Sequence, residues 1–111
     1  MIVMRAENAV PYQPAGHFGF VSLKYHNKDE LNGAMSLGLS KLEPGGYTDF
    51  SPRPVDMIYY VLEGQLTIRN DQETVVLGPN CSVRFEAGEK REVRNETDQP
   101  AAMLVIASFP H

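Results

Sequence analysis

One stretch near the middle of the chain constrains the fold more than any other. It opens with the turn sequence Pro44-Gly45-Gly46, and a short extended arm follows that is interrupted by Pro52 and Pro54. An apolar run over residues 57–62 comes next and stops just before Gly64. Because this run is apolar at odd and even positions alike, it predicts a strand that is covered on both sides.

Turn signals recur along the rest of the chain at roughly eight- to twelve-residue intervals, which is typical of short antiparallel strands. Beside the central run, strands are predicted over residues 19–25, 34–42, 65–69, 73–77, 81–86, 91–95 and 101–109. Residues 27–31 are expected to form one helical turn. The pattern therefore predicts an all-β fold, a sandwich or a barrel.

Length and composition exclude several classes of protein. A chain of 111 residues is near the commonest size of a single domain. Its formal charge of −4 is spread along the sequence, so no nucleic-acid surface is expected. We see no apolar run of signal-peptide or transmembrane length, and we expect a cytoplasmic protein that does not bind a membrane.

The single cysteine, Cys81, rules out an internal disulfide and fits a reducing compartment. Alternation along residues 81–86 places Cys81, Val83 and Phe85 on the inward face. Cys81 is accordingly predicted to be a small buried apolar residue.

Residues 44–64 resemble the first sequence motif of the cupin superfamily, and residues 77–95 resemble the second. The resemblance implies a cupin jelly-roll barrel, a double-stranded β-helix, with its core over residues 34–109 of a single domain, 1–111. Residues 1–18 lie outside the resemblance. In small cupins such a segment packs on the barrel or on a second subunit.

The same resemblance marks the positions at which cupins hold a metal. The two histidines of the first motif fall on Ser51 and Arg53, its glutamate falls on Met57, and the histidine of the second motif falls on Arg91. A hydroxyl, two protonated guanidiniums and a thioether are poor ligands for most metals. The resemblance therefore points to a subgroup that has lost the metal ligands, and we expect no metal or other cofactor.

A substitute metal site would need other ligands. His17 could swing over the barrel mouth and join Asp49. A site needs three or four converging ligands, and the sequence offers only these two good ones.

Strand alternation directs Arg53 and Arg91 into the barrel. A buried guanidinium without a partner costs several kcal/mol, so the pair needs a counter-charge. Asp49, on the same arm at matching parity, is the best internal candidate, and an anionic ligand bound in bidentate fashion is the other. Alternatively, Arg53 reaches solvent or pairs with Asp56, and Arg91 extends to the barrel mouth.

Tyr59 is expected to point into the cavity beyond Met57. Its phenol could donate a hydrogen bond or act as a general acid, with Asp49 as a base. The alternative is a core tyrosine whose hydroxyl is satisfied at the barrel end.

The opposite face of the same strand carries an apolar row, Ile58, Tyr60 and Leu62. An outward apolar row needs a cover. Residues 1–18 could supply it, or a second copy of the chain could, and we expect a homodimer.

Three functions remain open. In the first, the barrel binds a small anionic or carbonyl-bearing metabolite without a metal, with Ser51, Met57, Tyr59 and Asp49 around the two arginines, and it could catalyse an isomerase, cyclase or lyase step. In the second, it is a metal-dependent oxygenase or isomerase with atypical ligands. In the third, it is a non-catalytic sensor or accessory dimer.

The state of the cavity separates the first function from the third. Unpaired arginines in an open cavity favour ligand binding. A cavity plugged by Met57, Phe50 and an Arg53–Asp49 ion pair favours a scaffold.

Overall fold

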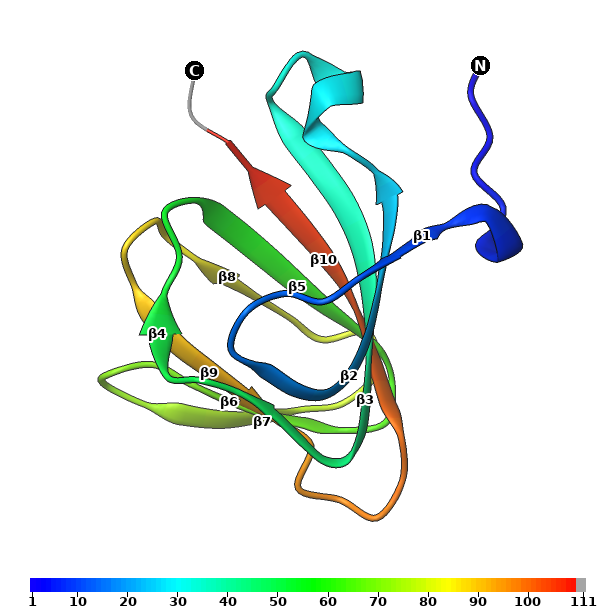
Figure 1. Cartoon of the computed structure of the whole chain (residues 1–111). Helices are drawn as coiled ribbons and strands as arrows, with labels where there is room; N and C mark the ends of the chain where they lie inside the picture. The colour runs from blue at the N-terminus through cyan, green and yellow to red at the C-terminus, as the bar shows by residue number, and fades with distance from the viewer. Residues whose placement is uncertain (110–111) are drawn as a thin grey trace.

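The structure, a computed structural model that describes residues 1–109, is a β-barrel (Figure 1). In chain order its elements are η1 (Ala6–Asn8), β1 (Val10–Tyr12), β2 (His17–His26), η2 (Lys28–Leu31), β3 (Met35–Thr48), β4 (Ser51–Pro52), β5 (Asp56–Glu63), β6 (Leu66–Arg69), β7 (Thr74–Leu77), β8 (Ser82–Phe85), β9 (Lys90–Arg94) and β10 (Ala101–Ser108). The all-β class and the predicted strands are confirmed, but the turn predicted at residues 44–46 is not, because β3 continues through them to Thr48. Within residues 1–109, neither short helix could span a membrane.

The strands pair antiparallel in the order β7-β6-β9-β3-β10-β5-β8, with β2 added to β3, β1 added to β2, and β4 paired with β9. The long strand β3 joins the two halves of this arrangement. Its first part lies between β2 and β10, and its last part reaches β9, where Tyr47 pairs with Arg94. Because β3 runs from one half to the other, the sheet curves around the interior and forms the double-stranded β-helix that the sequence predicts.

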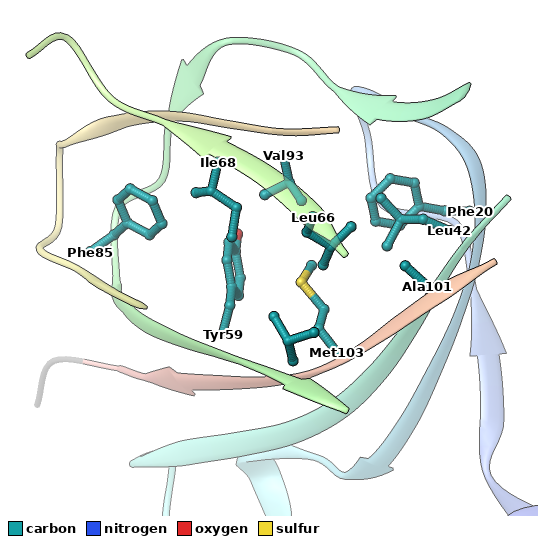
Figure 2. Close-up of a cluster of buried hydrophobic side chains, with 10 residues drawn as sticks. Phe20, Leu42, Tyr59, Leu66, Ile68, Phe85, Val93, Ala101 and Met103 are labelled. Atoms are coloured by element: carbon teal, nitrogen blue, oxygen red, sulfur yellow. The ribbon is translucent and has the colours of Figure 1, made fainter. Parts of the chain in front are cut away.

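The core occupies one part of the interior, where side chains from both halves meet (Figure 2). Tyr59 and Met103 point from β5 and β10 toward Leu66 and Ile68 on β6. The inward parity expected for Met57, Tyr59 and Val61 is confirmed. Tyr59 and Val61 are buried, and Met57 packs against the core from its edge.

Cys81 departs from its prediction, because its side chain is exposed. Its backbone N–H donates to the carbonyl of Gly78 across 3.2 Å, so Cys81 still belongs to the turn and precedes β8. The alternation holds only from Ser82 onward, with Val83 half-buried and Phe85 buried.

The outward row on β5 is present and uncovered within residues 1–109. Ile58 and Leu62 are 38% and 43% exposed. The register extends the row across two more strands, because Ile58 pairs with Ile106 on β10, which pairs with Leu37 on β3. The N-terminal strand β1 pairs with the edge of β2 and leaves this face open.

We propose that a second copy of the chain covers this face, and we expect the purified protein to be a dimer. Two-fold symmetry would place each substituted residue at the interface twice, so Ile58→Lys should yield a monomer with an unchanged circular dichroism spectrum. Light scattering coupled to size-exclusion chromatography measures this. Val76→Lys, on the exposed side of β7, is the control. A native monomer would contradict the proposal.

Candidate functional site

The barrel contains a cavity of about 260 Å³ beside the core, and this cavity is open to solvent at one side. Its walls come from the N-terminal segment, the arm before β5, and strands β2, β3, β5, β9 and β10. Three cationic side chains line it, those of Lys24, Arg53 and Arg91, and none of its described lining residues is a carboxylate. The cavity is therefore a cationic site with partly apolar walls, to which Met57, Met103 and Val105 contribute.

Arg91 lies on β9 opposite Ser51 of β4, and only 2% of its surface is exposed. Its Nε donates a hydrogen bond of 2.8 Å to the hydroxyl of Tyr59, and Nη1 donates to the carbonyl of Asp49 across 3.5 Å. Nη2 is buried and has no partner among the described residues. A buried charged donor without an acceptor is costly and calls for a specific explanation.

The hydroxyl of Tyr59 completes this cluster. It accepts from Arg91 and donates to the sulfur of Met57 across 3.7 Å. Tyr59 and Met57 both line the cavity, as expected from the parity of β5. The guanidinium of Arg91 is thereby held against the cavity wall by neutral groups only.

Arg53 also lines the cavity, half-buried, and its Nη2 donates to the carbonyl of Ala15 across 3.3 Å. The suggested pairing with Asp56 is not formed, because the Asp56 carboxylate accepts the backbone N–H of Ala87. Among the described residues, the ion pairs join only Glu92 to Arg69 and Arg94. Neither cavity arginine has a carboxylate partner.

Asp49 does not form the ion pair expected of it. It lies in the loop after β3, where its backbone N–H donates to the carbonyl of Gly16 and its exposed side chain rests beside that glycine. Packing of the N-terminal loop against this position turns the carboxylate away from the cavity lining. Asp49 reaches Arg91 through its backbone carbonyl alone.

Two further residues of the arm lie outside the cavity lining. Ser51 is in register with Arg91 on the neighbouring strand but does not line the cavity. Phe50 packs under Arg69, whose guanidinium carbon is 4.0 Å from the ring centroid. The cavity is consequently not plugged by Phe50.

The N-terminal segment contributes cavity residues, of which sequence reasoning placed only His17 at the barrel mouth. The loop between β1 and β2 is drawn across the barrel mouth in Figure 1, and Tyr12, Pro14 and His17 from this region line the cavity. Burial raises the pKa of Tyr12. The site is thus completed by chain that precedes both sequence motifs.

Lys24 and two buried serines of β3, Ser36 and Ser40, were also missed. The signal was the small polar face that alternates with leucines along residues 35–42. Ser36 and Ser40 on that face line the cavity, whereas Leu37 and Leu39 lie on the opposite face and Leu42 continues the inward face into the core.

The positive charges of Arg91 and Arg53 act on the imidazole of His17. Its Nδ1 is 2.8 Å from the carbonyl of Ala15, so this nitrogen carries the proton and donates, which leaves Nε2 as an acceptor. Burial lowers the pKa of His17, and Arg91 and Arg53 lower it further. The imidazole is neutral near pH 7.

The residues at the cupin ligand positions do not fit a metal ion. Arg53 and Arg91 would repel a cation, and Met57 offers only a thioether. His17 and Asp49 gain no third ligand, since no cluster of three histidine, cysteine or acidic side chains occurs within residues 1–109. The donors of this site suit an anion.

Comparisons with known proteins agree on the fold. The family model described as "Cupin domain" matches residues 38–107. A β-D-galactosidase of Mycobacterium tuberculosis is 31% identical over 111 residues, covering 99% of this chain and 96% of that protein.

Solved structures give the same result. The polyketide cyclase RemF of Streptomyces resistomycificus superposes with a TM-score of 0.85 at 20% identity, covering 97% of this chain and 79% of the cyclase. A predicted oxalate decarboxylase of Thermotoga maritima superposes with a TM-score of 0.81 at 17% identity, covering 98% and 100%.

The lowered pKa of His17 makes stability depend on pH. The unfolded chain takes up a proton near pH 6.5, whereas the folded chain does so only at lower pH, so stability should fall as pH drops from about 7 to about 5. His17→Gln should flatten this part of the profile. Urea unfolding at several pH values measures it, with His26→Gln on the same strand as the control. Equal slopes for both variants would contradict the assignment.

Proposed function

Because this chain belongs to the cupin domain family, we propose that its barrel binds a small anionic metabolite, without a metal ion, through Arg91 and Arg53. The observation that carries the proposal is the buried Nη2 of Arg91, a charged donor that lacks an acceptor within residues 1–109. A carboxylate or phosphate oxygen would supply that acceptor and the missing counter-charge together.

The size and lining of the cavity support a small ligand with a carbon skeleton. A volume of about 260 Å³ is just below the usual range for drug-sized ligands. At ~30 Å³ for each water-sized group, it holds roughly nine such groups. Met57, Met103 and Val105 offer an apolar wall to the skeleton, while Arg91 faces its acidic end.

The similar proteins are named for different reactions, and a shared fold does not by itself determine function. Glycoside hydrolysis usually requires a pair of carboxylates that flank the scissile bond. The described lining of this cavity has none. We therefore favour binding of an anion over hydrolysis of a neutral glycoside, even though the 31% identical relative is named as a galactosidase.

Arg91→Met tests the proposal directly. Hydrogen bonds to charged groups contribute about 1.5–3 kcal/mol, so affinity for a small carboxylate such as valerate should fall by roughly tenfold or more. Stability without ligand should be unchanged or higher, because a buried cation is removed and Tyr59 keeps its hydrogen bond to Met57. Calorimetric titration and thermal unfolding measure the two effects.

Arg84→Met is the matched control, since Arg84 is exposed on β8 and does not line the cavity. It should bind valerate as the native protein does. If Arg91→Met instead unfolds many degrees lower and still binds, Arg91 is a structural residue and the proposal fails.

An acid–base reaction is a second candidate function, and the placement of His17 favours it. The free Nε2 of His17 and the hydroxyl of Tyr59 belong to the same cavity, whereas the carboxylate of Asp49 does not. His17 would remove a proton from a carbon next to a carbonyl, and Tyr59 would donate one. This pair replaces the Asp49–Tyr59 pair expected from the sequence.

Deuterium uptake in D₂O reports such a reaction. With 2-oxopentanoate as the probe, the native protein should exchange the hydrogens next to the carbonyl faster than buffer does, as followed by proton NMR. His17→Gln and Tyr59→Phe should each remove the enhancement. Exchange at the buffer rate in the native protein would leave binding as the sole function proposed.

A further inference from the structure

Strand register places one inward residue from each of four adjacent strands in a single row. Tyr59 on β5 pairs with Val105 on β10, Val105 pairs with Gly38 on β3, and Gly38 pairs with Lys24 on β2. Directly paired residues share a face of the sheet. Lys24 therefore points to the same interior as Tyr59, at the opposite end of the row.

Within residues 1–109, the ammonium group of Lys24 has no counter-charge. Lys24 lines the cavity, and the ion pairs among the described residues do not include it. Its Nζ lies 4.8 Å from the centroid of the Tyr12 ring, which gives the cation a favourable contact with the ring face. Burial lowers the pKa of Lys24, as expected for a cation that lacks an anionic neighbour.

Small side chains separate Lys24 from Arg91. Val105 and Gly38 occupy the row between them, and Ser36 and Ser40 are the inward neighbours of Gly38 on β3. The hydroxyl of Tyr12 lies over Gly38, 3.5 Å from the point that a Cβ would occupy. Gly38 thus leaves room for the hydroxyl of Tyr12, and with Ser36 and Ser40 the cavity floor along β3 presents hydroxyl groups to a ligand.

The distance between the two ends of the row suits a short chain. Tyr59 and Lys24 are three strand spacings apart, about 14 Å along the curved sheet. Both side chains extend inward and shorten this span, and Arg91 binds at the hydroxyl end of Tyr59. A linear molecule of about four to six carbons matches the distance that remains between the charged groups of Lys24 and Arg91.

Charge balance points the same way. The lining carries Arg91, Arg53 and Lys24, with no described carboxylate, so a monoanion leaves most of the positive charge uncompensated. We propose that the ligand is a small dianion of the linear dicarboxylate class, with one acidic group on Arg91 and the other on Lys24. This inference rests on the proposed anion site at Arg91 and adds Lys24 as the residue that selects for a second acidic group.

The experiment compares ligands of equal length that differ in one charge. Succinate, glutarate and adipate are titrated calorimetrically against butyrate, valerate and hexanoate at constant ionic strength. The native protein should bind at least one dicarboxylate about tenfold more tightly than its monocarboxylate partner. Lys24→Met should remove that difference by weakening binding of the dicarboxylate far more than binding of its monocarboxylate partner, and Lys24→Arg should retain it.

Lys41→Met is the matched control, because Lys41 is exposed on the adjacent strand β3 and does not line the cavity. It should preserve the preference. Thermal unfolding confirms that each variant is folded before titration.

Two results would overturn the assignment of Lys24 but leave the proposed anion site at Arg91 standing. In one, each dicarboxylate binds no better than its partner, which means that Lys24 remains solvated at the mouth. In the other, Lys24→Met weakens both classes equally, which means that it acts only through the general field of the cavity. If no carboxylate binds at all, the proposed anion site at Arg91 fails, and the assignment to Lys24 fails with it.

Discussion

Antiparallel pairing of β5, β10, β3 and β2 is the constraint on which the rest of this structure depends. Each pairing aligns side chains that must all face inward or all face outward, so one choice of parity propagates across four strands. It places Tyr59 and Val61 inside and Ile58 outside, and it brings Lys24 into the same interior as Tyr59. The core, the cavity and the exposed apolar face all follow from this register.

Much of the fold could be predicted because alternation and turn chemistry are local. The inward parity of Tyr59 and the inward position of Arg91 followed from the motifs and the period of two. The orientation of Asp49 could not be found this way, since it depends on the packing of a loop from the far end of the chain. Lys24 was missed because its role requires the register between β2 and β3, which no local pattern specifies. The prediction that Cys81 is buried was wrong for a smaller reason, because the turn before β8 ends one residue later than the alternation suggested.

The chemistry of the cavity differs from that of a metal-binding barrel through substitution rather than rearrangement. Arg53, Met57 and Arg91 stand at positions where the cupin motifs carry metal ligands, and they line the cavity. The backbone still directs side chains to one place, but those side chains now present positive charge. Within one barrel, a site that would hold a cation becomes a site that suits an anion, which illustrates why the fold alone does not name the ligand.

The N-terminal segment at the cavity mouth lies outside the part of the chain that matches the family model, residues 38–107. Tyr12, His17 and Lys24 precede residues 38–107, yet they form one side of the cavity. Substitutions among the first 24 residues can therefore change one wall of the cavity while both motifs stay intact. Two chains with the same barrel motifs can thus present different cavity walls, because part of each wall is built from residues that the motifs do not include.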